Sequence, residues 1–158
     1  MSDLKAISMW QPWASGVALG LKGFETRSWQ TSYRGRLVVH AAQRRTELHV
    51  LYSIGAMRGA FHAAGMRDLT DFPLGAYVAI VELVAIWPAD SSTLAFRLSP
   101  LELAFGDFSP GRFAWELKLL EKLDPPIAAR GYQGLWDVKP TELEPVGYSG
   151  PIHDRAGG

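Results

Sequence analysis

The chain has 158 residues, of which 47% are hydrophobic and 20% charged, values typical of one globular domain with a core of its own. Its 16 basic and 16 acidic side chains give a formal net charge of zero, which excludes a polycation that would coat long duplexes. The absence of cysteine excludes disulfide bonds and thiolate metal sites. The N-terminus lacks a signal-peptide pattern and no apolar run reaches membrane-spanning length, so we expect a cytoplasmic protein without a membrane partner.

Positive charge is concentrated in the first part of the chain. Residues 1–45 carry seven basic and two acidic side chains, a net charge of +5, and the remainder of the chain carries −5. Tryptophan and tyrosine side chains are interleaved with these cations. Such a local basic and aromatic region on a neutral body is suited to hold phosphate groups at one site, although Arg44 and Arg45 by themselves indicate only a solvated surface.

The N-terminal part of the sequence predicts short strands around one helix. Pro12 suits the first position of that helix, because its missing N–H needs no partner there. Trp13, Val17 and Leu21 repeat every four residues and form the apolar face. The predicted elements are a strand over 4–9, a helix over 12–21, a strand over 24–29, a polar turn over 31–35 and a strand over 36–42.

The remainder predicts a helical insertion followed by two long strands. We expect the pair Pro125-Pro126 to end the second long strand, since proline cannot donate to a sheet ladder. From Lys139 onward the chain is rich in proline and glycine, so we expect residues 139–158 to form an extended tail. The predicted elements are helices over 45–57 and 59–66, a loop over 71–75, a strand over 76–87, an irregular or weakly helical stretch over 88–100, a helical turn over 101–105 and strands over 112–123 and 135–138.

Strands dominate this pattern and do not alternate with helices as βαβ units. The pattern favours an α+β domain built on a small, strongly bent sheet or a partly closed barrel, with the first helix as a cap and residues 45–66 as a helical insertion. No repeat or low-complexity segment divides residues 1–138, which we expect to form a single domain.

The segment from Gly20 to Trp29 carries the densest chemistry of the sequence. Alternate side chains of a strand share a face, so Glu25, Arg27 and Trp29 are expected to point the same way, with Lys22 in the turn just before. Buried charges are costly unless paired, so this wall suits a pocket for a polar, planar, partly anionic ligand better than a core. The alternatives are an exposed Glu25–Arg27 ion pair and a solvated Lys22 at a helix end.

Tryptophans are candidates for stacking on a base. Trp10 and Trp29 lie next to polar groups in the sequence and are the better candidates. Trp13, in the helical stripe, is assigned to the core, as are Trp115 and Trp136 by default.

Several polar residues are candidates for contacts with the same ligand. Gln11 would supply amide contacts to a base edge, and the Tyr33-Arg34 pair would reach a second phosphate unless it forms only a turn. His40 lies on a strand, where a satisfied buried histidine is more common than a catalyst, and Glu82 interrupts a hydrophobic strand and is expected to face the site. Asp107, Arg112 and Glu116 are weaker options for the place of Glu82. The predicted ligand-binding set is Trp10, Gln11, Lys22, Glu25, Arg27, Trp29, Tyr33, Arg34, His40 and Glu82.

Taken in order, seven blocks of the chain resemble an ASCH domain, a member of the PUA-like β-barrel superfamily, over residues 4–138. The blocks are Ile7-Ser8-Met9-Trp10-Gln11-Pro12-Trp13-Ala14, Gly20-x-Lys22-x-x-Glu25-x-Arg27-x-Trp29, Tyr33-Arg34-Gly35, Val39-His40-Ala41, Val78–Val84, Arg112–Leu117 and Gly131–Trp136. The resemblance implies a cleft between the first helix and the barrel that is suited to RNA or a modified nucleoside.

Members of this family also include ribonucleases and amidohydrolases that act on acylated cytidine. The amidohydrolase type carries Gly-x-Lys-x-x-Thr-x-Arg, in which the lysine and threonine are catalytic. Lys22 and Arg27 keep their places here, whereas Glu25 stands in the place of the threonine and Thr26 follows it. This difference argues against chemistry that uses a hydroxyl nucleophile.

We therefore expect a domain that binds RNA or a modified nucleoside, as a single strand or a flipped-out base, in a polar cleft. The alternative is a hydrolase that acts on RNA phosphodiesters or on an acylated base, with Glu25 as general base and Lys22 stabilising the oxyanion. A protein-interaction module is a third possibility, and it would show an apolar patch in place of the cleft. The sequence indicates no metal and no cofactor.

Overall fold

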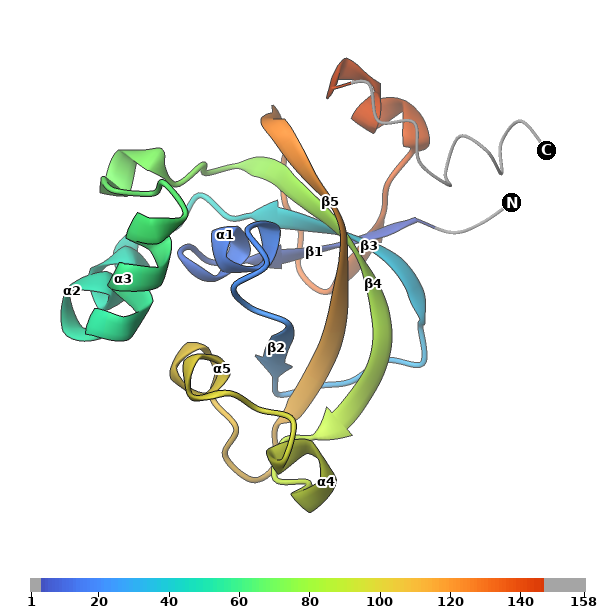
Figure 1. Ribbon diagram of the computed structural model, residues 1–158. Helices are drawn as coiled ribbons and strands as arrows, with labels where there is room; N and C mark the ends of the chain where they lie inside the picture. The colour runs from blue at the N-terminus through green and yellow to red at the C-terminus, as the bar shows by residue number, and fades with distance from the viewer. Residues whose placement is uncertain (1–3, 147–158) are drawn as a thin grey trace.

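One mixed sheet surrounded by short helices forms the body of the computed structural model, which describes residues 4–146 (Figure 1). The strands pair in the order β2-β5-β4-β3-β1-β6. Only β1 and β3 run parallel among these pairs. The strands are β1 (Lys5–Met9), β2 (Phe24–Arg27), β3 (Gly35–Ala41), β4 (Ala76–Pro88), β5 (Phe113–Ala128) and β6 (Leu135–Asp137).

The helices are short and lie outside the sheet. In Figure 1 the helical insertion, with α2 and α3, projects from one side, and α4 and α5 lie at one end. No helix among the described residues is long and apolar enough to cross a membrane. The helices are α1 (Trp13–Ala18), α2 (Val50–Ser53), α3 (Gly55–Ala63), α4 (Ser92–Ala95) and α5 (Pro100–Phe105), with 3₁₀ helices η1 (Thr46–His49), η2 (Leu69–Asp71) and η3 (Pro140–Val146).

The sheet bends strongly along its two longest strands, β4 and β5, which cross most of the molecule in Figure 1. Three register shifts between them mark bulges, which increase local twist and curvature. The edge strands β2 and β6 do not pair with each other within residues 4–146, so the barrel stays open. The α+β, PUA-like architecture expected from the sequence is confirmed.

Two buried clusters lie on opposite faces of the sheet. One contains Ile7, Val39 and Trp115 and is covered by α1, whose Val17 is buried. The other contains Val38 and lies where η3 packs on the sheet. Period-two alternation in β1 and β3 supplies side chains to both faces, which is why these strands are apolar on each side.

Several boundaries differ from the sequence prediction: α1 and β2 are shorter, and α3 begins at Gly55, inside the helix predicted over 45–57. Two further differences affect β5 and the C-terminal segment. Pro125-Pro126 does not end β5, because the register passes from Ala79–Lys122 to Tyr77–Ile127 and leaves the prolines in an unpaired bulge. Residues 140–146 form η3 in place of an extended tail, because Leu143 is fully buried in the second cluster. Residues 147–158 lie outside the described part of the chain.

Candidate functional site

A large cleft of about 1530 Å³ opens beside the edge strand β2. Its walls come from the ends of β1 and β3, from β2, from the loop after α5 and from residues 128–134. Because these segments are far apart in sequence, only the folded sheet brings them together.

Glu25 joins two cations at the inner wall of the cleft. Its Oε2 accepts from Arg27 Nε at 3.1 Å, and its Oε1 lies 3.5 Å from Lys22 Nζ. Arg27 also donates through Nη2 to the backbone carbonyl of Ser8 at the end of β1. The strand alternation expected for Glu25 and Arg27 is therefore seen, and both side chains line the cleft. The contact with Ser8 ties the free edge of β2 to β1.

Lys22 lies behind Glu25 and does not line the cleft. Its side chain is 1% exposed, and its ammonium has no hydrogen-bond partner among the described residues. The Phe105 ring lies 6.0 Å from the ammonium, and a Cβ at Gly16 would come within 3.4 Å of Lys22 Cβ. The glycine inside α1 therefore permits the close packing that buries this lysine.

A second carboxylate, Glu102 on α5, belongs to the same inner cluster. Its Oε2 accepts from the backbone N–H of Gly23 at 2.5 Å, and its Oε1 is buried without a partner among the described residues. Burial raises the pKa of Glu102, while the Gly23 hydrogen bond and the nearby Lys22 ammonium oppose the rise. Sequence patterns do not single out Glu102, because it lies about eighty positions after Lys22 and on an otherwise apolar helix.

Trp10 and Trp29 line the cleft in different ways. Trp29 is partly buried and meets the edge of Trp115 at 4.9 Å between ring centroids. Trp10 is 46% exposed, and the Arg44 guanidinium lies 4.1 Å from its ring centroid. Trp115 is fully buried as expected, whereas Trp13 is only partly buried and contributes to the cleft wall.

His40 lines the cleft but is held by structural hydrogen bonds. Its Nε2 lies 2.7 Å from the carbonyl of Ala129, which can only accept, so Nε2 carries the proton. Nδ1 then accepts from the Ser8 hydroxyl at 3.1 Å. Burial lowers the pKa of His40, with the Ala129 hydrogen bond opposing that shift. His40 therefore fixes the loop after β5 onto β1 and β3.

Besides Lys22, three residues of the N-terminal part of the predicted set lie outside the cleft wall. Gln11 is fully buried. Its Nε2 donates to the Ser15 hydroxyl and to the carbonyl of Pro73, and its Oε1 accepts from the Ser15 backbone N–H, so its amide is not available to a base edge. The Tyr33 hydroxyl donates to the carbonyl of Arg36. Arg34 is exposed and donates to carbonyls of its own turn. These contacts correct the expectation that Gln11, Tyr33 and Arg34 face the ligand.

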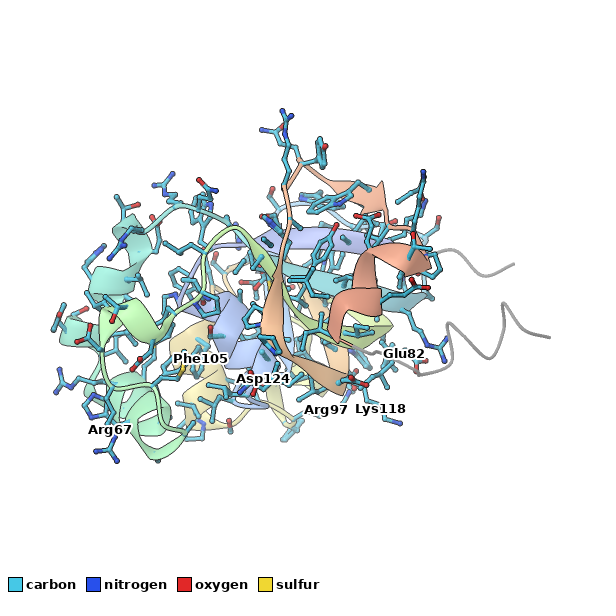
Figure 2. All side chains as sticks on the ribbon, turned by 90° about the horizontal axis from the view of Figure 1, so that it is seen from above. Arg67, Glu82, Arg97, Phe105, Lys118 and Asp124 are labelled. Carbon is cyan, nitrogen blue, oxygen red and sulfur yellow. The ribbon has the colours of Figure 1, made fainter. Side chains whose placement is uncertain are left out.

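Glu82 also differs from expectation. Figure 2 shows it beside Lys118, its register partner on β5, and well apart from Phe105, which lines the cleft. Its side chain is exposed. Among the weaker options for its place, Asp107 and Arg112 line the cleft, whereas Glu116 forms an ion pair with Arg97 at 2.6 Å.

The loop after β5 adds two cleft residues that the sequence analysis did not propose. Arg130 and Tyr132 both line the cleft, and Tyr132 is 53% exposed. Their position depends on β5 running past Pro126 and on the loop folding back over His40. The signal available in the sequence was the aromatic turn Gly131-Tyr132-Gln133-Gly134, which predicts a turn but not where it lies.

The family model of the ASCH domain matches residues 7–127. This range contains β2, β3 and β4 completely and most of β1 and β5, and it ends before β6. The chain belongs to the ASCH domain family.

Solved structures agree with this assignment at the level of the fold. The ASCH protein of Zymomonas mobilis aligns with a TM-score of 0.54 and 17% identity, over 90% of this chain and 92% of that chain. A point mutant of the same protein aligns with a TM-score of 0.53 and 16% identity, over 92% and 96%.

Among curated proteins, Activating signal cointegrator 1 of Mus musculus is 33% identical over 78 residues, and the Homo sapiens protein is 31% identical over 78 residues. The match covers 49% of this chain and 13% of each relative, so the matched region is a small part of those longer proteins.

Proposed function

We propose that this ASCH domain binds RNA through an unpaired base, or a modified nucleoside of the same chemistry, in the cleft beside β2. The observation that carries the proposal is that Glu25, Arg27, Trp29 and Trp10 line one cleft. A carboxylate, a guanidinium and aromatic rings are the groups that contact a base edge, a phosphate and a base face.

Arg27 is positioned to act on a ligand. Its Nε and Nη2 are held by Glu25 and Ser8, which leaves Nη1 with no partner among the described residues. Because the side chain is already fixed, binding a phosphate or a carbonyl there costs little conformational entropy.

The charge of the cleft wall suits a ligand with few phosphates. The charged residues of the wall are three arginines and two acidic residues, which give it a net charge of +1: Arg27, Arg112, Arg130, Glu25 and Asp107. Affinity should therefore fall only modestly with salt, as expected when roughly one or two phosphates are neutralised. Membership of the ASCH family supports the same ligand class through the resemblance described above.

A hydrolase is the second candidate, and the buried Lys22 beside Glu25 favours it. In this version Glu25 takes a proton from water as the water oxygen bonds to the phosphorus of a phosphodiester or to the acyl carbon of an acylated base. The P–O or C–N bond to the leaving group then breaks, and the protonated Glu25 returns the proton to the leaving oxygen or nitrogen. Lys22 does not line the cleft, so it would act on Glu25 and not on the developing oxyanion.

The binding proposal is tested by comparing two arginines. Arg27→Ala should weaken the affinity for short fluorescent RNAs about 10- to 100-fold, because a charge-assisted hydrogen bond is lost. The control Arg34→Ala removes an exposed arginine outside the cleft and should leave affinity unchanged. Equal effects of both changes, measured by fluorescence anisotropy, would contradict the proposal.

The hydrolase candidate is decided on the unmodified protein. Short RNAs and a panel of modified nucleosides are incubated with it, and retained ligand and product are followed by mass spectrometry. Retention without any product rules out hydrolysis of those compounds and leaves binding.

A further inference from the structure

Two exposed aromatic side chains line the cleft, and each lies beside an arginine. Trp10 is 46% exposed with Arg44 4.1 Å from its ring centroid, and Tyr132 is 53% exposed with Arg130 5.3 Å from its ring centroid. The other strongly exposed aromatic rings of the described chain, Tyr52 and Phe96, lie outside the cleft and have no arginine over them. Exposed aromatics paired with arginine are therefore a feature of this cleft.

The Trp10 ring is held in place before any ligand arrives. Arg44 covers the ring and is itself held by Glu47 through two contacts, at 2.6 Å and 3.0 Å. Glu47 compensates the charge of Arg44, so Arg44 serves to support the indole more than to hold a phosphate. A supported ring that is almost half exposed is a ready surface for a base.

The Tyr132 ring is supported by a different set of contacts, with aromatic rings of β3 and β6. Its ring meets Trp136 at 5.5 Å between centroids, and Trp136 meets His40 at 5.7 Å, both edge to face. Gly131 fits closely over His40, since a Cβ there would come within 2.5 Å of the imidazole. These edge-to-face contacts, together with the close fit of Gly131, hold the turn that carries Tyr132 in place.

The positive charge of Arg130 is not compensated by a carboxylate of the described residues. No carboxylate of the described residues lies within ion-pair distance of Arg130, in contrast to Arg27, Arg44 and Arg112. A phosphate beside Tyr132 would therefore meet a cation with an uncompensated charge.

The size of the cleft exceeds what a nucleoside needs. Pockets for single small molecules measure about 300–1000 Å³, and this cleft measures about 1530 Å³. Two separate supported rings in such a volume provide two places for bases on one strand.

We propose that the cleft takes a single-stranded oligonucleotide and not a free nucleoside, with one base stacked on Trp10, a second on Tyr132 and a phosphate on Arg130. This inference rests on the proposed function and extends it to a second base site formed by Tyr132 and Arg130.

The length of the ligand gives the first test. Fluorescein-labelled oligoadenylates of 1, 2, 4, 6 and 8 nucleotides are titrated with the protein, and affinity is measured by anisotropy. Affinity should rise at least about 10-fold from the mononucleotide to the length that reaches both rings, and then level off, since stacking adds about 5- to 100-fold for each base.

Substitutions give the second test. Tyr132→Ala should weaken binding of the longest oligoadenylate about 5- to 100-fold and so remove most of the gain in affinity from the mononucleotide to the octanucleotide. Tyr132→Phe keeps the ring and should bind as the unmodified protein does. Tyr52→Ala and Phe96→Ala remove exposed rings outside the cleft and should change neither affinity.

The outcomes separate this inference from the proposed function. If the mononucleotide binds as tightly as the octanucleotide, or if Tyr132→Ala binds the octanucleotide normally, the second base site is wrong and nucleotide binding itself still stands. If neither oligoadenylates nor short RNAs of mixed sequence bind, both proposals are wrong.

Discussion

The inner and outer parts of the cleft are built in opposite ways. At the inner wall, Glu25 and the Lys22 behind it have side chains 12% and 1% exposed and compensate each other's charge. At the rim, Trp10 and Tyr132 are about half exposed and belong to none of the buried hydrophobic clusters of the described residues. The inner cluster is therefore coupled to the stability of the fold, whereas the rim can change with little effect on folding.

The physical reason for this difference is desolvation. A charge that is removed from water needs a partner, and deleting that partner leaves an uncompensated buried charge. An exposed ring has no such dependence, so its main contribution is to contacts with a ligand.

The largest effect is expected from Glu25→Leu, which leaves the Lys22 ammonium buried without a carboxylate at ion-pair distance. The free energy of unfolding should fall by about 3–5 kcal/mol, as measured by urea denaturation. The double variant Glu25→Leu with Lys22→Met should recover most of the loss, because no buried cation is left unpaired.

The matched change at the rim is Trp10→Ala, which should alter the free energy of unfolding by less than about 0.5 kcal/mol. A loss at Trp10 as large as that at Glu25 would show that the two parts of the cleft do not differ in this way.

An intermediate effect is expected from Gly131→Ala, which links the two parts. Its Cβ would come within 2.5 Å of His40, whose ring is fixed by hydrogen bonds to Ser8 and Ala129, so the loop must move. We expect a loss of about 1–3 kcal/mol in unfolding free energy and weaker binding of long oligoadenylates.

The control for this change is Gly59→Ala in α3, where nothing lies within 4 Å of the added Cβ. It should raise the free energy of unfolding by up to about 1 kcal/mol, since alanine favours a helix more than glycine does. A Gly131→Ala variant that unfolds like this control would show that the loop is not held by His40.

The smallest effect is a pH dependence at Glu102. Because burial raises its pKa, the native state binds this proton more tightly than the unfolded chain does. As pH falls from 7 toward 5, the unmodified protein should gain stability relative to Glu102→Gln, and it should lose that gain as pH rises again. Urea titrations of both proteins at the two pH values measure the difference, and a difference of opposite sign would contradict the buried placement of Glu102.

Local patterns in the sequence were sufficient to predict that Lys22, Glu25 and Arg27 lie close together. Alternation along β2 places Glu25 and Arg27 on the same wall, and the spacing of three between Lys22 and Glu25 brings their charges together. These are short-range relations, so they follow from the geometry of one strand and the turn before it.

Long-range relations account for the residues that the sequence analysis misplaced. Gln11 looks free in the sequence, but the fold brings the Pro73 carbonyl to it. Glu82 interrupts an apolar strand, but it lies on the exposed face opposite Lys118. Which face of a strand is covered depends on what packs there, and a single strand does not contain that information.

By itself, the sequence determined the family, the strand-rich class of the fold and the ionic trio Lys22, Glu25 and Arg27, because each depends on residues that are neighbours along the chain. The tertiary structure decided that Lys22 is buried behind Glu25, that Glu102 joins it from α5, and that Arg130 and Tyr132 reach the cleft. Those placements depend on a sixteen-residue strand that continues through two prolines in a bulge and on a loop that packs over His40. Contacts between segments so far apart are formed only when the whole sheet assembles.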